Sequence, residues 1–274
     1  MAEQGETSMQ WWGATDVTMG TCRRWKIGPL ALWIQRLPGE WRIARASNDD
    51  PSDSDVQLAI PESGADLLTH ALVSRFGIGG DNESVALLPA LADRALISTP
   101  QRPFIVPAGK DVTLYITSPL WVQLSVGAES TSLEEFSIQQ PPDTWFGPNT
   151  QIGEICYASR SFCRVQLDAI PRLPHRATTS VVVENHASTP LTLERINLPV
   201  PFLSLFCEPE SGDLWTNDVV FQRVEGEPMA PLRVSSGMPA ASPKATELVS
   251  PRKRSSGNIM IRAFETLFSE REGS

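Results

Sequence analysis

Cysteine, histidine and lysine are all scarce in this chain of 274 residues. The four cysteines have no C-x-x-C spacing, and the three histidines have no H-x-x-x-H pair. Because zinc sites usually have ligands at such short spacings, the sequence predicts no structural metal. The cysteine content is also much lower than that of the small secreted domains that disulfides stabilise. We therefore expect a fold that its hydrophobic core stabilises, with no cofactor.

Long apolar runs and an excess of positive charge are also missing. No run of about 18 apolar residues predicts a transmembrane helix, and residues 1–10 are polar, unlike a secretory signal. The net charge is -9, from 32 acidic and 23 basic residues. A net negative charge is unfavourable for non-specific binding to the phosphates of nucleic acid. We expect a cytoplasmic protein that does not bind nucleic acid.

Short alternating segments predict β-strands, and the first pair surrounds Pro38-Gly39. If these two residues form the whole loop of a hairpin, Ile34 lies opposite Ile43 and Arg36 lies opposite Trp41. The first pair would be a core contact and the second a cation–π contact. The type II turn that Pro-Gly favours twists against an ideal two-residue hairpin, so a wider loop is the alternative.

Further alternating segments, separated by turn residues, continue to about residue 224 and are typical of a β-sandwich or barrel. The sequence predicts a mainly β fold of two antiparallel sandwich or jelly-roll-like lobes, followed by a C-terminal amphipathic helix. The expected parts are an N-terminal lead-in over residues 1–21, a first β lobe over 22–140, a second β lobe over 141–226, an extended linker over 227–257 and the helix over 258–274.

Six stretches carry a family resemblance: residues 25–30 (WKIGPL), 40–41 (EW), 118–121 (SPLW), 145–150 (WFGPNT), 153–154 (GE) and 191–195 (LTLER). They resemble an uncharacterised prokaryotic family, domain of unknown function 432, over most of residues 22–225. The resemblance implies no known activity and supplies no catalytic residue. It implies an association with small mechanosensitive channels, because genes of the family often lie near theirs.

The segment over residues 145–157 is the most unusual in composition. Its notable residues are Trp145, Phe146, Asn149, Thr150, Glu154 and Tyr157. Aromatic rings beside small polar groups often build a ligand pocket or the centre of an interface. The alternative is a structured turn in which Asn149 and Thr150 bond to local backbone.

A polar cluster and a cysteine pair are further candidates. The cluster would bring together Glu154, His175, Arg176, Glu194 and Arg195. A glutamate and a histidine can serve as acid and base, but surface ion pairs produce the same set, and no G-x-S-x-G motif is present. We therefore assign no catalytic residue. If Ser159-Arg160 is a loop, Cys156 faces Cys163, either as a disulfide or as two small buried hydrophobic residues.

The C-terminal segment is the last candidate for interaction. Its residues are Arg252, Lys253, Arg254, Ile261, Phe264, Leu267 and Phe268. Basic residues beside an amphipathic helix suit an anionic membrane surface, a groove on a partner protein, or docking on the chain's own body. We expect a non-enzymatic binding or scaffold protein. The alternatives are a small-ligand or carbohydrate-binding module and an enzyme of unrecognised type.

Overall fold

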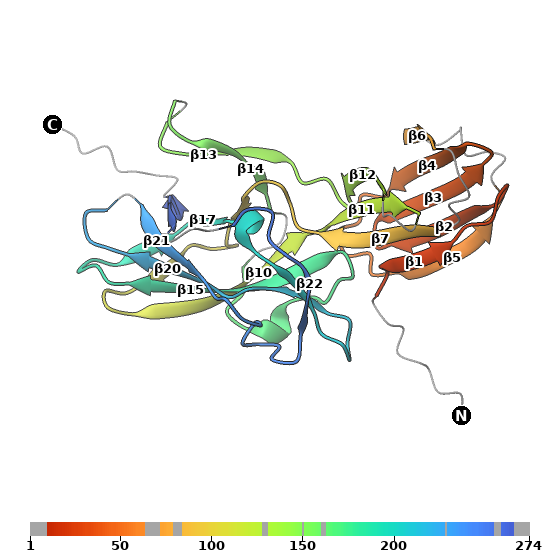
Figure 1. Ribbon diagram of the computed structural model, residues 1–274. Coiled ribbons are helices and arrows are strands. Elements are labelled where there is room, and N and C mark those ends of the chain that lie inside the picture. Colours follow the sequence, from red (N-terminus) through yellow and green to blue (C-terminus); the bar gives the residue numbers. More distant parts are fainter. Residues whose placement is uncertain are drawn as a thin grey trace.

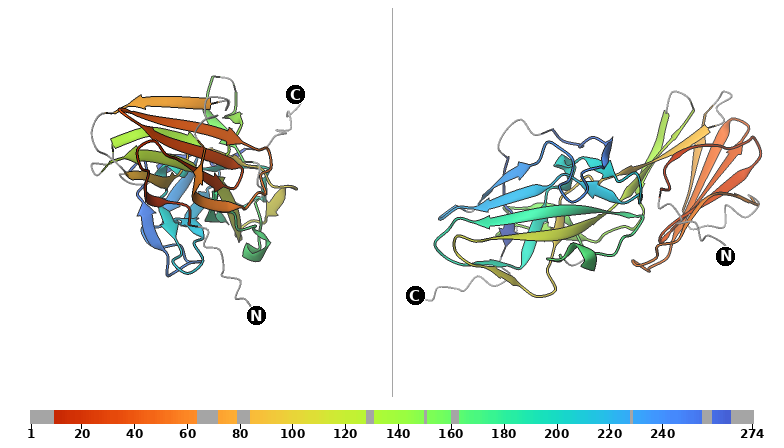
Figure 2. Two further views of the ribbon diagram at one scale, coloured as in Figure 1. Left: turned by 90° about the vertical axis from the view of Figure 1, so that its right-hand side faces the viewer. Right: turned by 90° about the horizontal axis from the view of Figure 1, so that it is seen from below.

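The computed structural model describes residues 10–63, 72–78, 84–127, 131–149, 151–159, 163–227, 229–254 and 259–265. β-strands make up most of these residues, and the helical segments are the short 3₁₀ turns η2 (Leu167–Ala169) and η3 (Val200–Phe202). The strands form two lobes that lie end to end (Figure 1), as the view from below in Figure 2 also shows. The prediction of a mainly β fold is confirmed.

Two antiparallel sheets form the first lobe. Its strands are β1 (Gly13–Asp16), β2 (Cys22–Ile27), β3 (Leu30–Leu37), β4 (Glu40–Ser47), β5 (Val56–Glu62), β6 (Leu72–Gly77), β7 (Ser84–Ala90), β11 (Trp121–Val126) and β12 (Thr131–Ser137). They pair in the orders β1-β7-β11-β12 and β5-β2-β3-β4-β6.

The hairpin predicted around Pro38-Gly39 is confirmed. Leu37 pairs with Glu40, so the loop contains only two residues, and Ile34 lies opposite Ile43. Both isoleucines are fully buried in the main core. Arg36 lies opposite Trp41, with its Cζ atom 5.9 Å from the centre of the indole ring.

Three sheets form the second lobe. Its strands are β8 (Leu96–Ser98), β9 (Phe104–Val106), β10 (Asp111–Pro119), β13 (Asp143–Phe146), β14 (Glu154–Ala158), β15 (Arg176–Asn185), β16 (Leu191–Leu193), β17 (Arg195–Leu198), β18 (Leu205–Cys207), β19 (Leu214–Thr216), β20 (Val219–Arg223), β21 (Ala230–Val234), β22 (Thr246–Val249), β23 (Ile259–Ile261) and β24 (Phe264–Glu265). The largest sheet has the order β22-β18-β19-β15-β20-β21-β23, with β10 also paired to β15. The others are β13-β14-β8-β17-β24 and β16-β9. Because β15 runs parallel to β19 and β20, this lobe is mixed and not purely antiparallel.

The chain passes between the two lobes three times: after β7, between β10 and β11, and after β12. Only Leu120 separates β10 from β11, so one nearly continuous run of strand enters both lobes. Residues 96–119, which we placed in the first lobe from sequence, contribute β8, β9 and β10 to sheets of the second. One cluster of buried residues extends through both lobes, which ties them together.

The predicted C-terminal helix is wrong for the residues that the structure describes. β23 adds to the edge of β21, and β24 adds to the edge of β17. These edges offer unpaired backbone groups, and the mostly apolar segment at 259–264, which contains Arg262, is too short for its spacing to distinguish helix from strand. Leu267 and Phe268 lie outside the described residues. The expected linker over 227–257 contributes β21 and β22 to the largest sheet.

Candidate functional site

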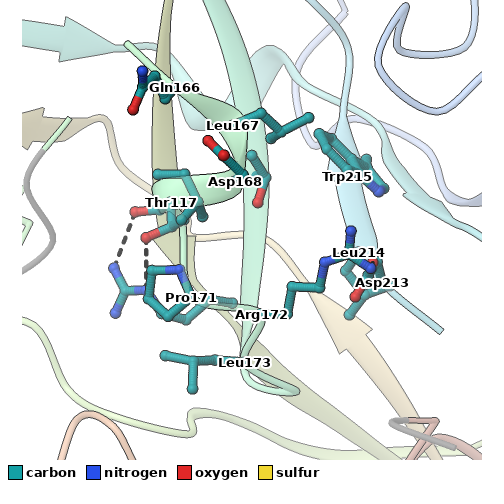
Figure 3. Close-up of a pocket in the computed structure, with 13 residues that line it drawn as sticks. Thr117, Gln166, Leu167, Asp168, Pro171, Arg172, Leu173, Asp213, Leu214 and Trp215 are labelled. Carbon is teal, nitrogen blue, oxygen red and sulfur yellow. Dashed lines mark hydrogen bonds and ion pairs between the residues drawn. The ribbon is translucent and has the colours of Figure 1, made fainter. Parts of the chain in front are cut away.

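A cavity of about 610 Å³ lies on the face of the largest sheet opposite the main core (Figure 3). Strands β10, β15 and β19 supply one side of it, and the segment over residues 166–173 supplies the other. Cavities that hold small molecules commonly have volumes of roughly 300–1,000 Å³. Its size therefore makes this cavity the leading candidate for a binding site.

Strand alternation decides which side chains reach the cavity. On β15, Ala177 is buried in the main core, while its neighbours Arg176 and Thr178 point to the opposite face. Thr178 pairs with Thr117 of β10 on one side and with Trp215 of β19 on the other. These three residues form a row across the sheet, so the floor of the cavity changes from hydroxyl groups to an indole ring.

The opposite wall is fixed to the sheet at several points. Just before this segment, Arg164 and Tyr115 of β10 exchange two backbone hydrogen bonds, of 2.7 and 3.0 Å. The 3₁₀ turn η2 follows, and the Leu167 side chain packs against the cluster that contains Trp215. Farther on, Arg172 forms a 2.8 Å ion pair with Asp213 at the start of β19. These contacts hold the wall of the cavity against the sheet.

Arg176 is the buried charge of the cavity. Its side chain is 7% exposed, and its Nε and Nη2 atoms donate hydrogen bonds to the Thr117 hydroxyl at 2.9 Å and the Thr117 carbonyl at 3.0 Å. Burial lowers the pKa of Arg176 to about 10, so the guanidinium still carries its charge at neutral pH. The rim carries the exposed side chains of Asp168 and Arg172.

The chemistry of this arrangement favours binding of a small organic molecule. Leu167 and Trp215 give an apolar surface, while Arg176 and Thr178 give hydrogen-bond donors. Within the described ranges, no group of three or more His, Cys, Asp or Glu side chains is arranged to hold a metal ion. The donors and the apolar surface together can fix the orientation of an organic ligand.

The segment predicted from its aromatic composition forms the β13–β14 hairpin, away from this cavity. Trp145 is 39% exposed, and its indole Nε1 donates to the Asn149 carbonyl at 2.9 Å. The Asn149 side-chain oxygen accepts hydrogen bonds from the backbone N–H groups of Gln151 and Ile152. Asn149 therefore stabilises the local turn, which was the alternative that we considered. Thr150 lies outside the described residues.

The remaining residues of this segment bond to neighbouring strands. Phe146 is buried beneath Arg195, whose Cζ atom lies 5.2 Å from the centre of the phenyl ring. Arg195 Nη2 also donates to the Trp145 carbonyl at 2.8 Å. Glu154 accepts a hydrogen bond from the Asn197 amide at 3.0 Å, and the hydroxyl of the buried Tyr157 donates to Asp93. Glu194 lies between β16 and β17.

The polar cluster predicted from sequence is divided between different parts of the molecule. Arg195 lies beside Trp145 in the five-stranded sheet, whereas His175 is fully buried where residues of the first lobe meet β15. Burial and, to a smaller extent, the charge of Arg176 together lower the pKa of His175 to about 4. His175 is therefore neutral at pH 7. Among the predicted site residues that the structure describes, Arg176 is the one that lines the large cavity.

The four cysteines are present as free thiols. Cys156 is fully buried against Ile97 and Phe146, and its cross-strand neighbour on β13 is Thr144. Cys163 packs in the main core. Burial raises the pKa of Cys156 to about 12 and that of Cys163 to about 11, so both are small hydrophobic residues at neutral pH.

Two of the basic residues before the predicted helix contact the chain's own body. Arg252 donates through Nε and Nη2 to the Leu91 carbonyl, at 2.8 and 2.6 Å, and forms an ion pair with Glu135. Lys253 Nζ lies 6.0 Å from the centre of the Phe202 ring, and Arg254 is exposed. Farther on, Ile261 pairs with Ala230, and Phe264 packs edge-on against Phe221 at 5.7 Å.

Sequence reasoning missed Trp215 and the wall of the cavity. The alternation on β15 was sufficient to place Thr178 and Arg176 on one face. Residues 166–173 have no helical or strand periodicity, however, and nothing local indicates that they cover β19. The site depends on pairings between strands that lie far apart in the sequence.

Comparisons with known proteins agree with the family resemblance seen in the sequence. No curated protein and no solved structure matches the chain significantly. In the described part of the chain, no helix combines the length and the apolar character needed to cross a membrane. The family model described as "Protein of unknown function (DUF432)" matches residues 11–269, and the chain belongs to this family.

Proposed function

We propose that the chain is a non-enzymatic binding protein that holds a small organic molecule in the cavity between β19 and residues 166–173. The observation that carries this proposal is the cavity of about 610 Å³ beside the buried cation Arg176. Because hydrogen bonds and an ion pair tie its wall to the sheet, the cavity requires little ordering when a ligand enters, which favours affinity. Trp215 supplies apolar contact, and Thr117 and Thr178 supply polar groups beside it.

Ligand-observed NMR tests this proposal with a set of small acids, amides and sugars, each at about 1 mM, which detects weak binding. A Thr178→Phe variant would place an aromatic ring in the cavity without removing Arg176. Thr113→Phe is the matched control, because Thr113 lies on the same face of neighbouring β10, is also partly exposed, and does not line the cavity.

We expect the wild type and Thr113→Phe to bind the same subset of compounds, and Thr178→Phe to lose them. Equal binding by all three proteins would place the ligand elsewhere and contradict the proposal. Absence of any binding by the wild type would also contradict it.

The exposed apolar face of the β13–β14 hairpin supports a second candidate, a contact surface for another protein. Trp145 and Ile155 are cross-strand neighbours on this face, and they are 39% and 56% exposed. Ile152 in the connecting loop is 60% exposed. Exposed aromatic and aliphatic side chains grouped in this way are common at protein interfaces.

A double variant, Trp145→Ser with Ile155→Ser, tests this second candidate. Ile105→Ser is the matched control, because Ile105 is 67% exposed on β9, outside the hairpin. Cross-linking in the native host, followed by sedimentation velocity of the purified material, should show a complex for the wild type and for the control. The double variant should not form this complex. Identical behaviour of the three proteins would rule the hairpin out as the contact.

A further inference from the structure

The lining of the cavity also indicates which class of small molecule it holds, an inference that rests on the proposed function. We propose that the ligand is a neutral monosaccharide. Its hydroxyl groups bind Gln166, Asp168 and Thr178, and the apolar face of its ring packs against Trp215 and Leu167. The charges of the lining, its unpaired polar groups and their positions around the apolar surface each support this class.

The charges that line the cavity favour an uncharged ligand. The charged side chains among the described lining residues are Asp168, Arg172, Arg176 and Asp213, which sum to zero. Arg172 forms a 2.8 Å ion pair with Asp213, and the guanidinium of Arg176 is engaged by Thr117. A charged ligand would lose its hydration on entering and would gain no net attraction in return. A neutral ligand avoids this cost.

The polar groups that remain for a ligand suit hydroxyl groups. Among the described lining residues, the side chains of Gln166, Asp168 and Thr178 form no hydrogen bond or ion pair with the rest of the chain. The Asp168 carboxylate only accepts hydrogen bonds, whereas the Gln166 amide and the Thr178 hydroxyl both donate and accept. A hydroxyl group also donates and accepts, so a ligand with several of them can bond to all three side chains. A carboxylate only accepts and an ammonium only donates, so neither matches the whole set.

These three side chains come from two sides of the cavity. In the wall, Gln166 and Asp168 lie on either side of Leu167, at the start of the 3₁₀ turn η2 (Figure 3). Thr178 belongs to β15 in the floor. A sugar ring carries hydroxyl groups around its edge, so it can bond to the wall and the floor together. This arrangement favours a ring with several polar groups over a chain with one polar end.

Apolar side chains lie among these polar groups. Trp215 follows Thr178 in the row across the floor, and Leu167 packs against the cluster that contains Trp215. Ile170 also lines the cavity. One face of a sugar ring presents C–H groups, which are apolar, and packing against the indole would remove them from water. The lining therefore matches both the edge and the face of such a ring.

Matched glycosides test the inference on the wild-type protein. For each of glucose, galactose and mannose, three probes are titrated to about 10 mM: the neutral methyl glycoside, its uronic acid and its 2-amino derivative. Backbone amide shifts in residues 166–173 and 176–178 give the dissociation constants. We expect at least one neutral glycoside to bind, with a dissociation constant about threefold or more below those of its two charged counterparts.

The results separate the ligand class from the proposed function. Tighter binding of a charged counterpart would overturn the class and leave the cavity a binding site. So would the absence of shifts with every glycoside while acids or amides from the ligand screen shift the same residues. If no compound of either set shifts these residues, the proposed function fails as well.

Two variants with matched controls locate the hydroxyl contacts. Thr178→Val removes a hydroxyl group with little change in shape, and Thr113→Val is its control outside the cavity. Asp168→Ala removes an exposed acceptor, and Asp49→Ala is its control, at an exposed position between β4 and β5. We expect each cavity variant to weaken binding of the neutral glycoside about fivefold, and neither control to change it. Equal affinities for the wild type and all four variants would refute the proposed contacts.

Discussion

Replacing Gly28 by alanine should destabilise the contact between the two lobes. Gly28 is the first residue of the two-residue turn between β2 and β3, where Ile27 pairs with Leu30, and its φ angle is +52°. A Cβ atom there would lie 2.5 Å from His175 Nδ1 and 2.7 Å from the Asp53 carbonyl oxygen. Because His175 is fully buried and the Asp53 oxygen belongs to the backbone, neither atom can move away easily.

Two effects add in this variant. The left-handed backbone conformation costs about 1–2 kcal/mol for a residue with a Cβ atom. The overpacking against His175 and Asp53 adds about 1–3 kcal/mol. We therefore expect Gly28→Ala to lower the free energy of unfolding by about 2–5 kcal/mol, a large part of the roughly 5–15 kcal/mol typical of a folded protein.

Gly39→Ala separates the two effects. Gly39 also has a positive φ angle, of +71°, but a Cβ atom there would meet nothing within 4 Å. This control has the conformational cost alone, and the smaller entropy of the unfolded alanine chain affects both variants equally. Urea unfolding followed by circular dichroism should place the midpoint of Gly28→Ala well below that of Gly39→Ala. Midpoints that agree would refute the close contact between Gly28 and His175.

Three further predictions concern other side chains. Arg252→Ala should lower the free energy of unfolding by about 1 kcal/mol, because it removes hydrogen bonds to the Leu91 carbonyl and to Glu135 from an exposed side chain, whereas Arg254→Ala, at a position that is also exposed, should change it little in the same urea assay. The pKa of His175 is about 4 in the folded protein and near 6.5 when unfolded, so the unfolded state binds the proton first and stability should fall by about 3 kcal/mol as pH drops from 6.5 to 4. His175→Gln should flatten this part of the stability profile, and an unchanged slope would contradict the assignment. Cys156 should react with a thiol reagent at pH 8 only after unfolding, since burial raises its pKa to about 12, and rapid labelling of the native protein followed by mass spectrometry would contradict that burial.

Sequence reasoning succeeded where a structure depends on neighbouring residues. The Pro38-Gly39 hairpin is such a case, because the loop residues and the alternation on each side determine the register together. Strand alternation also places Leu32 and Ile34 in the core, while Trp33 packs with Cys22 and Ala44 on the other face of the sheet.

The sequence predictions were wrong where the position of a segment in the fold depends on which distant strand it pairs with. Alternation in β10 shows which side chains share a face, but not that β15, rather than β11, supplies its neighbour. The run at 259–264 was compatible with a helix in spacing, and the edges of β21 and β17 made it two short strands. The cavity could not be predicted for two reasons. Its floor is built from three strands that lie far apart in the sequence, and the sequence of its wall has no helical or strand periodicity.

The lobe junction and the cavity share a short stretch of chain. His175 packs against the first lobe, and the adjacent Arg176 lines the cavity. The backbone N–H of Leu120, between β10 and β11, donates to the His175 carbonyl at 3.0 Å. The start of β15 is therefore held from the side of the junction, which helps to keep the Arg176 guanidinium in place.

Mapping of backbone amide shifts on titration with the compounds that bind in the ligand-observed NMR screen of small acids, amides and sugars tests the central claim most directly, because it locates the bound molecule in the wild-type protein. The account predicts that the largest changes fall in residues 166–173, at Arg176 to Thr178 and at Asp213 to Trp215, the parts that enclose the cavity. Changes confined to the β13–β14 hairpin, or no changes at millimolar probe, would contradict the claim that this cavity is the binding site.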